Sequence, residues 1–162
     1  MALNVVRVAV AKDIDSLQRL EETAFRGDRL TRRSFRRWLR HSLCVFLVCE
    51  RAGKIAGYIL IGFRRGSRRA RMYSLAVDPA WRRRGIALLL IEKAEQATWD
   101  AGALSMRLEV AANNAAAVQL YRKLGYTRFG VYRDYYEDHS DALRMEKCIN
   151  EADRRSALPW SS

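Results

Sequence analysis

The spacing of hydrophobic residues along the chain predicts alternating strands and helices. Strands are expected where apolar residues alternate with polar ones or form a short continuous run, and helices where they recur every three or four positions. The expected strands are residues 4–10, 43–50, 54–63, 70–77, 104–110, 126–132 and 142–148. The expected helices begin after the caps Asp13 and Thr31, at Gly85 and at residue 115, and the last two end at Gly102 and Gly125. The predicted order is therefore βααβββαβαββ.

Two of these strands decide the fold class. Residues 43–50 and 54–63 are apolar on both faces, so the sheet needs helices on both sides. The strand–helix–strand passage from 70–77 to 104–110 predicts a crossover connection within the sheet. The chain is thus expected to be a single-domain α/β protein with a mixed β-sheet flanked by helices. Its 162 residues fit one domain, assigned to residues 1–150, followed by a flexible C-terminal tail at 151–162.

Patterns inside the elements predict which side chains each one buries. In the first strand Val6, Val8 and Val10 alternate with less apolar residues, which predicts one hydrophobic face. The second helix is expected to turn Phe35 inward and its arginines outward. In strand 104–110 the apolar residues alternate with polar ones, so Glu109 should lie on the face opposite the core.

The composition is that of a globular protein without a membrane segment. No apolar run approaches the roughly 20 residues of a membrane helix, and the N-terminus lacks a basic-then-apolar signal pattern. A cytoplasmic location without a membrane partner is therefore expected. Cys44 and Cys49 would lie roughly 16 Å apart in a strand, which excludes a disulfide between them. With only His41 and His139 and no clustered Cys/His spacing, no metal site is expected.

The chain is strongly basic. Its 30 Lys and Arg residues against 18 Asp and Glu residues give a formal net charge of +12. Such a balance fits nucleic acid, ribosomes, an acidic peptide or a cofactor that carries phosphate. The arginines gather at 32–33, 36–37, 64–65, 68–71 and 82–84. For the groups other than 82–84, a solvated helix face or turn is the simpler interpretation.

The arginines at 82–84 stand in a turn between a strand and a helix. Arg82, Arg83 and Arg84 precede Gly85, Ile86 and Ala87, where the helix begins. The first N–H groups of a helix have no intrahelical acceptor and lie at the positive end of its dipole, so this turn is suited to anionic phosphates. Gly85 and Ala87 keep side chains small where a pyrophosphate would touch the backbone. The spacing matches neither the dinucleotide fingerprint nor the Walker loop.

The segment Arg82-x-x-Gly85-x-Ala87 resembles the acetyl-CoA loop of the GNAT superfamily of N-acetyltransferases, (Q/R)-x-x-G-x-(G/A). The resemblance continues for about seventy residues in the order expected for that superfamily. The further matching segments are Ser74–Pro79, Leu108–Val110, Asn113–Ala117, Leu120-Tyr121, Leu124–Tyr126, Tyr135-Tyr136, Asp141-Ala142 and Met145–Lys147. This ordered set is similar to the branch of bacterial ribosomal-protein alanine N-acetyltransferases, which acetylate protein N-termini.

The resemblance implies a function and a cosubstrate. It implies acetyl transfer from acetyl-CoA, without a metal, directly to a primary amine, with a protein or peptide N-terminal α-amine as the first choice of acceptor. It also implies that acetyl-CoA is bound by backbone groups of Leu75, Ala76 and Val77, by the loop residues Arg82, Arg83, Arg84, Gly85, Ile86 and Ala87, and by Asn114 and Tyr121. Asn113 or Asn114 is also expected to cap the helix that follows, so Asn114 could cap that helix, bind the pantetheine arm, or do both.

Two residues are candidates for acid–base chemistry by this resemblance. Glu109 would be the general base. An α-amine with a pKa near 8 is about one-tenth neutral at pH 7, whereas a lysine amine would cost about 3 kcal/mol more to deprotonate. The alternative for Glu109 is an ion pair with Arg107 or a loop arginine. Tyr121 would protonate the departing thiolate, to which a phenol with a pKa near 10 is well matched; the alternative is an ordinary core tyrosine on an apolar helix stripe.

The acceptor side is less constrained. Tyr135 and Tyr136 resemble the paired tyrosines that hold a substrate peptide backbone, and Tyr73 could line the same groove, although all three could equally be packing groups. The hairpin at 24–31 lacks a Pro-Trp element found in the ribosomal enzymes. Ala111 stands at the position where, in that family, an arginine often follows the Leu-Glu-Val segment. Two other functions stay open: a small-molecule amine acetyltransferase, which acidic residues Asp134, Glu137, Asp138 and Asp141 would support, and a ribosome- or nucleic-acid-binding protein that keeps the fold. Arginine clusters could also attach an active enzyme to ribosomes.

Overall fold

The computed structural model describes residues 3–25, 27 and 29–149. Its strands are β1 (Asn4–Val8), β2 (Cys44–Arg51), β3 (Lys54–Phe63), β4 (Arg69–Val77), β5 (Ser105–Ala111), β6 (Thr127–Tyr132) and β7 (Ala142–Cys148). Its helices are α1 (Ile14–Ala24), α2 (Arg32–Arg40), α3 (Ile86–Asp100) and α4 (Ala115–Lys123), with short 3-10 turns η1 (Ala11–Asp13) and η2 (Pro79–Trp81). The predicted order of strands and helices is confirmed. The tail expected at 151–162 lies outside the described residues.

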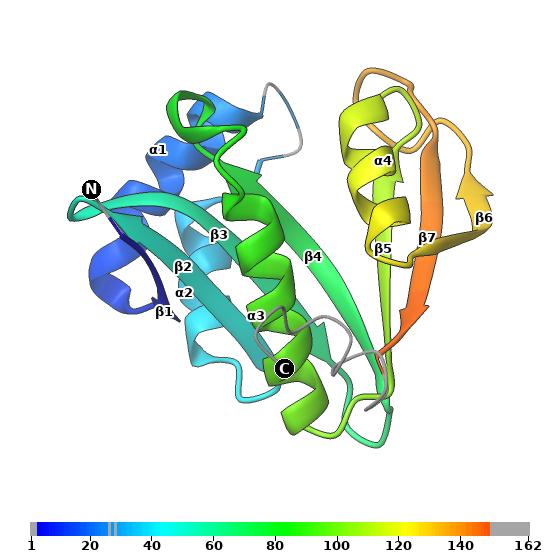
Figure 1. Ribbon diagram of the computed structural model, residues 1–162, viewed down its shortest axis with the longest axis horizontal. Coiled ribbons are helices and arrows are strands. Elements are labelled where there is room, and N and C mark those ends of the chain that lie inside the picture. The colour runs from blue at the N-terminus through cyan, green and yellow to red at the C-terminus, as the bar shows by residue number, and fades with distance from the viewer. Residues whose placement is uncertain (1–2, 26, 28, 150–162) are drawn as a thin grey trace.

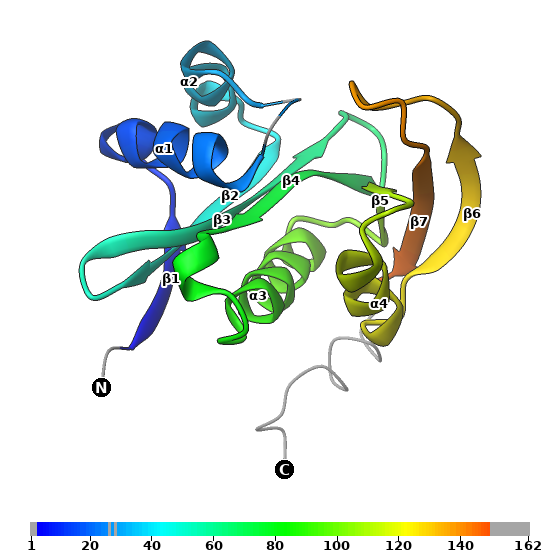
Figure 2. The ribbon, with the colours of Figure 1, turned by 90° about the horizontal axis from the view of Figure 1, so that it is seen from above.

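The strands form one mixed sheet in the order β1-β2-β3-β4-β5-β7-β6. Only the β4–β5 pair is parallel, and it is the pair that α3 connects; the other neighbours are antiparallel. Helices α1 and α2 cover one face of the sheet, and α3 and α4 cover the other (Figures 1 and 2). The predicted α/β class, with a mixed sheet flanked by helices, is confirmed.

Strand β3 shows why both faces must be covered. All seven residues from 56 to 62 are buried. Because successive side chains point to opposite faces, Tyr58 and Leu60 pack beneath α1 and α2, whereas Ile59 and Ile61 pack against the core that α3 closes. The two hydrophobic cores therefore share the same strand.

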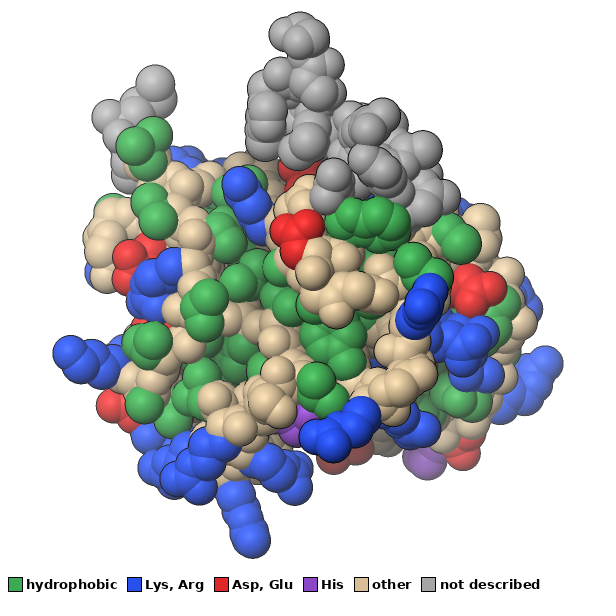
Figure 3. Space-filling view, turned by 90° about the horizontal axis from the view of Figure 1, so that it is seen from below, with side chains coloured by type: hydrophobic (Ala, Val, Ile, Leu, Met, Phe, Trp, Pro, Cys, Tyr) green, Lys and Arg blue, Asp and Glu red, His purple; other side chains and the backbone are tan. Residues whose placement is uncertain are grey.

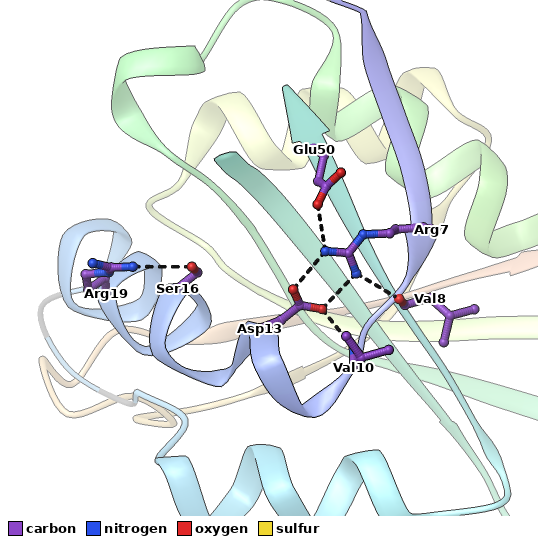
Figure 4. A network of polar contacts seen from close by, with 7 residues as sticks. All are labelled: Arg7, Val8, Val10, Asp13, Ser16, Arg19 and Glu50. Atoms are coloured by element: carbon purple, nitrogen blue, oxygen red, sulfur yellow. Dashed lines mark hydrogen bonds and ion pairs between the residues drawn. The ribbon is translucent and has the colours of Figure 1, made fainter. Parts of the chain in front are cut away.

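The start of the chain differs from its prediction. Strand β1 ends at Val8, and both Val8 and Val10 are largely exposed, so the predicted alternation does not bury them. Asp13 does not cap α1. Its carboxylate accepts from the Val10 amide at 2.8 Å and from both terminal nitrogens of Arg7 at 2.8 Å, while Arg7 also bonds Glu50 of β2 (Figure 4). Asp13 thus caps the 3-10 turn η1 and pairs with Arg7 of β1, and its side chain does not cap α1.

A bulge in β4 changes which of its residues face each core. The β3–β4 pairing passes from Ile61–Met72 directly to Leu60–Ser74, so Tyr73 has no partner. Met72 lies in the α3 core, and beyond the bulge it is Leu75 that packs there. A single extra residue exchanges the two faces in mid-strand and leaves Tyr73 43% exposed.

The sheet divides between β4 and β5. Their parallel pairing runs from Arg69–Ser105 only as far as Met72–Leu108. Beyond that point β4 stays paired with β3 up to Val77, and β5 stays paired with β7 up to Ala111. The two strands then diverge as the arms of a V, which Figure 1 shows between β4 and β5. Backbone groups on the inner edges of the V have no strand partner.

Candidate active site

A cavity of about 1040 Å³ fills the V between β4 and β5. Its walls come from the ends of β4 and β5, the turn before α3, helix α4, the end of α1 with the loop after it, and the β6–β7 loop. The lining therefore includes residues from both faces of the sheet, so the cavity passes between the strands. Its volume lies at the upper end of the roughly 300–1,000 Å³ typical of small-ligand sites, which suits a long ligand.

The turn before α3 contributes to one wall of this cavity, and its backbone is suited to an anion. Gly85 has φ = 76°, a left-handed conformation that glycine adopts without strain, and Arg83 also has a positive φ of 62°. The first α-helical hydrogen bond runs from Leu89 N to Gly85 O at 3.0 Å. The amides of residues 86–88 precede it and have no acceptor within the helix. Arg82 and Ala87 of this turn line the cavity.

The remaining loop residues do not line the cavity. Arg83 and Arg84 are exposed, and the Arg84 guanidinium lies 5.6 Å from the ring centre of Trp81, whose ring also has Arg51 at 5.1 Å. The side chain of Ile86 is buried in the α3 core, so only its backbone amide can meet a ligand. Of the six predicted loop residues, the cavity lining therefore contains two.

The other predicted donor-side residues all line the cavity. Leu75, Ala76 and Val77 form the β4 arm of the V. Asn114 caps α4, because its side-chain oxygen accepts from the Ala117 amide at 3.2 Å. The capping interpretation is thus confirmed, and the amide nitrogen of the same side chain is left to donate to a ligand.

Tyr121 belongs to the core and to the cavity wall at once. Only 7% of the residue is exposed, and its ring meets Tyr126 edge-on with centroids 5.6 Å apart. Its hydroxyl lies 3.6 Å from the sulfur of Met72, a weak acceptor. Burial, and secondarily the proximity of Tyr136, raises the pKa of Tyr121 well above its usual value. The hydroxyl therefore keeps its proton at neutral pH.

Glu109 lines the cavity from β5 and forms an ion pair. Its side chain is 13% exposed, and Oε2 accepts from Nε of Arg71 on β4 at 3.2 Å. The expected alternative partner, Arg107, bonds Glu146 instead at 3.0 Å. Arg71 could not be singled out in the sequence, because the parallel register that brings β4 and β5 together is set by the fold.

The three tyrosines of the acceptor side are separated by the structure. Tyr73 and Tyr136 line the cavity. Tyr135 does not, and it stacks on Tyr132 with centroids 5.4 Å apart while its ring meets Tyr136 edge-on at 5.0 Å. Tyr135 can therefore support Tyr136 without lining the cavity itself.

Residues 11–126 match the Acetyltransferase (GNAT) family. The chain belongs to this family.

Relatives and solved structures agree with the assignment. The chain is 38% identical over 79 residues to the [ribosomal protein bS18]-alanine N-acetyltransferase of Salmonella typhimurium, a match that covers 47% of this chain and about half, 53%, of that enzyme. It is 31% identical over 144 residues to an uncharacterized N-acetyltransferase of Methanocaldococcus jannaschii, covering 88% and 90% of the two chains. The crystal structure of the ribosomal-protein-S18-alanine N-acetyltransferase from Escherichia coli superimposes with a TM-score of 0.84 at 25% identity, covering 91% of this chain and 95% of that one.

The cavity suits acetyl-CoA, the acyl donor of GNAT enzymes. Unpartnered helix amides and Arg82 stand at one end, where the pyrophosphate would be held. The open edge of β4 at residues 75–77 offers backbone groups to an extended amide-bearing arm. The hydroxyl of Tyr121 and the side chain of Asn114 lie in the same wall. The pyrophosphate, the amide-bearing arm and the thioester of the donor would therefore each face a group of matching chemistry.

Several residues that line the cavity of this GNAT protein were not among the site residues predicted for N-terminal acetylation, although Glu137 and Asp138 were named in support of a small-amine acceptor. Ala24, Phe25 and Gly27 come from the end of α1 and the loop after it, and Glu137 and Asp138 come from the β6–β7 loop. The two loops touch, because a Cβ placed on Gly27 would lie 2.3 Å from Oε2 of Glu137. Only tertiary structure joins segments so far apart in the chain.

A buried polar network supports the same wall. Glu21 is 1% exposed; its carboxylate accepts from the Leu30 amide at 2.8 Å and from the hydroxyl of Tyr58. That hydroxyl also lies 2.6 Å from Oγ of Ser74, which lines the cavity. Glu21 thereby ties the loop between α1 and α2 to β3 and β4.

Two further features bear on ligands and surroundings. Within residues 3–25, 27 and 29–149, no group of three or more His, Cys, Asp or Glu side chains is arranged to hold a metal ion. In the same described part of the chain, every helix is too short or too polar to traverse a bilayer.

Proposed function

We propose that this GNAT enzyme transfers the acetyl group of acetyl-CoA directly to the α-amine of a protein or peptide N-terminus. The observation that carries the proposal is a cavity that passes between β4 and β5, with the turn before α3 at one end and Glu109 with Tyr136 toward the other. Donor and acceptor can then enter from opposite faces of the sheet. Their reacting atoms meet in the V without a covalent enzyme intermediate.

The proposed chemistry assigns one proton to each of two side chains. The amine nitrogen attacks the acyl carbon, the carbon–sulfur bond breaks, and the electron pair of that bond leaves on sulfur. Glu109 takes the amine proton, directly or through water, with Oε1, because Oε2 is engaged by Arg71. Tyr121 gives its proton to the thiolate. Its raised pKa keeps the hydroxyl protonated before the reaction, although it also makes the hydroxyl a weaker acid than a free phenol. Its weak sulfur acceptor leaves the hydroxyl able to turn toward the thiolate.

The preference for an N-terminal amine rests on chemistry and on the acceptor wall. An α-amine is about one-tenth neutral at pH 7, so a carboxylate base has little deprotonation cost to overcome. The hydroxyls of Tyr73 and Tyr136 offer hydrogen bonds to a peptide backbone, and the contact of Tyr135 with Tyr136 fixes that ring. The Salmonella typhimurium relative is named an alanine N-acetyltransferase of ribosomal protein bS18, which supports a protein acceptor for this chain.

The proposed roles are tested by two substitutions. Glu109→Gln and Tyr121→Phe should each lower turnover more than tenfold and leave acetyl-CoA affinity nearly unchanged, because each removes a proton-transfer group while the ring at position 121 and the rest of the donor site stay in place. Steady-state kinetics with a peptide acceptor and calorimetry with acetyl-CoA measure the two effects.

Matched controls exist for both variants. Glu146→Gln removes the carboxylate of the neighbouring pair with Arg107, and Tyr126→Phe removes the hydroxyl of the ring that packs on Tyr121. Both should keep turnover within about twofold. Wild-type turnover in Glu109→Gln and Tyr121→Phe would overturn the mechanism.

A small cationic amine is the second candidate acceptor, and one observation favours it. Glu137 and Asp138 line the cavity, whereas Asp134 and Asp141 do not. Two of the four acidic residues thus stand where a polyamine could bind. Competition between a peptide library and a panel of small amines for labelled acetyl-CoA decides the question, and acetylation of the amines alone would reject the N-terminal proposal.

A further inference from the structure

The net positive charge of the chain comes from one segment. Residues 29–71 contain 13 Lys and Arg residues and a single acidic residue, Glu50. Their formal charge of +12 equals that of the whole chain, because the remaining residues hold 17 basic and 17 acidic side chains. The excess charge is therefore a property of the α2–β4 region and not of the molecule at large.

The fold gathers much of this charge at one end of the sheet. Helix α2 leads into β2, and Cys44 at the start of β2 pairs with Gly62 near the end of β3, just before the β3–β4 turn. Glu50 lies at the other end of β2, bonded to Arg7. Lys and Arg side chains gather along the lower margin of the molecule in Figure 3. We call the following seven residues the basic end: Arg36, Arg37 and Arg40 of α2, and Arg64, Arg65, Arg68 and Arg69 around the β3–β4 turn.

The basic end is not neutralised by the protein itself. All seven arginines are exposed. Among the described residues, none of them forms an ion pair. Uncompensated charges of one sign on a single surface attract a polyanion and release its counterions on binding.

A row of aromatic rings leads from the basic end to the cavity. The rings of His41 and Trp38 lie 5.3 Å apart, and those of Trp38 and Tyr73 lie 4.8 Å apart. Tyr73 also lines the cavity. Gly62 makes room for the row, because a Cβ there would lie 2.7 Å from Tyr73 and 2.8 Å from Trp38. We call His41, Trp38 and Tyr73 the aromatic row.

We propose that the basic end, with the aromatic row beside it, binds single-stranded RNA. A guanidinium group can donate two parallel hydrogen bonds to the oxygens of one phosphate. Exposed aromatic rings can stack on unpaired bases, which single-stranded RNA offers and a duplex does not. A membrane surface is disfavoured, because Phe35 is buried and Trp38 and Leu39 are half-buried, leaving α2 no exposed apolar side chain to insert. Through the aromatic row, bound RNA would lie next to the acceptor side of the cavity.

The test measures RNA binding by the full chain without substrates. A fluorescently labelled 12-nucleotide single-stranded RNA is titrated with protein at 50 and 200 mM salt, and anisotropy gives Kd. The basic-end variant replaces Arg36, Arg37, Arg64 and Arg65 with Gln. The control variant makes the same charge change at four exposed residues elsewhere: Lys12, Arg19, Arg122 and Lys123. Thermal unfolding checks that both variants are folded.

The expected result is a loss confined to the basic-end variant. Removing four phosphate contacts from a single-strand complex should flatten the dependence of log affinity on log salt by about 2.8. Between 50 and 200 mM salt the wild type should therefore lose about fiftyfold more affinity than the variant does. The control variant should follow the wild type.

Three outcomes would overturn the proposal. An equal loss in both variants would show only non-specific attraction by net charge. Tighter binding of a 12-base-pair DNA duplex, or of vesicles rich in anionic lipid, would assign the surface to another partner. Unchanged RNA affinity in the basic-end variant would remove the surface altogether. None of these readouts uses acetyl transfer, so they are independent of the proposed function, which fails separately if no free peptide is acetylated.

Discussion

Two acidic side chains near the N-terminus have opposite electrostatic settings. Asp13 hydrogen-bonds Arg7, which lowers the pKa of its carboxyl despite burial. The carboxylate of Glu21 instead accepts from the Tyr58 hydroxyl and the Leu30 amide. Burial raises the pKa of the Glu21 carboxyl even though these two hydrogen bonds and the nearby charge of Arg29 lower it. The folded state therefore favours the charged form of Asp13 and the neutral form of Glu21.

Asp13→Asn should destabilise the protein at neutral pH. The stabilisation from a carboxyl with a lowered pKa is present above its unfolded pKa of about 3.9 and is lost as pH falls through the folded value. We expect a loss of about 2 kcal/mol at pH 7 and a progressively smaller difference from wild type below pH 4. Urea unfolding at several pH values measures it.

The matched control is Asp15→Asn, at a carboxylate that pairs with Arg32 but is 72% exposed. An exposed pair of this kind contributes under about 1 kcal/mol. An equal effect of the two substitutions would show that the buried contact with Arg7 has no special weight.

Single residues show what the sequence could and could not predict about the site. Glu109 was placed on the correct face of its strand by simple alternation, and Asn114 was identified as a helix cap; both follow from local pattern. The partner of Glu109 is Arg71, which lies 38 residues away in the chain. Such a contact depends on the register between β4 and β5, which no local pattern encodes. The catalytic and binding roles themselves stay predictions.

At the scale of elements, the start of α3 depends on one backbone conformation. Gly85 has a positive φ and no atom near its missing Cβ, so an added side chain would be strained without a steric clash. Gly102, just after α3, has the same two properties, with φ = 97°. The two glycines differ in one respect: Gly85 directly precedes the amides of residues 86–88, which have no acceptor within the helix.

Gly85→Ala and Gly102→Ala should each lower the free energy of unfolding by about 1 kcal/mol, because each forces a left-handed conformation on alanine. Only Gly85→Ala should also weaken acetyl-CoA binding severalfold, because it alone disturbs the amides before Leu89. Denaturant unfolding and calorimetry separate the two effects. Equal acetyl-CoA affinity in both variants would show that the conformation of Gly85 does not contribute to donor binding.

Element boundaries were predictable where local signals were strong. Strand β3 begins at Lys54 and ends at Phe63 as expected, because a Gly-containing turn stands on each side. The bulge at Tyr73 was not predicted. Residues on both sides of it could face either core, so the sequence gives no sign of the extra residue. The prediction that Val8 and Val10 share a buried face with Val6 was wrong: Val6 packs against the α3 core, but β1 ends at Val8 on the edge of the sheet, and Val8 and Val10 are exposed.

At the scale of the whole molecule, only four residue pairs hold β4 to β5, from Arg69–Ser105 to Met72–Leu108. The two parts of the sheet are otherwise joined by the ion pair of Arg71 with Glu109, by the hydrogen bond from the Leu104 amide to the Arg68 carbonyl, and by packing. A ligand in the V would contact both parts, so it should stabilise the fold as a whole. With donor at a hundred times its Kd, linkage gives about 2.7 kcal/mol.

Hydrogen exchange tests this expectation. Acetyl-CoA should slow exchange in peptides that cover residues 73–77 and 86–89, because their free backbone groups face the cavity. Peptides that cover β6, at the far edge of the sheet, should gain only the protection that follows from the higher stability of the whole fold, and less than the two cavity segments gain. Unchanged exchange at residues 73–77 and 86–89, or protection of β6 alone, would contradict a donor site in the V.

The length of the aromatic row sets the distance between RNA bound at the basic end and the acceptor side of the cavity. From the ring of His41 to that of Tyr73 the distance is at most about 10 Å, close to three residues of extended chain. If RNA bound at the basic end belongs to the same particle as the substrate polypeptide, the amine of that polypeptide reaches the cavity only when its N-terminus lies within a few residues' length of the bound RNA. Longer connections dilute the local concentration of the tethered amine. Selection among otherwise similar N-termini could then depend on where they emerge from a particle, and not only on their sequence.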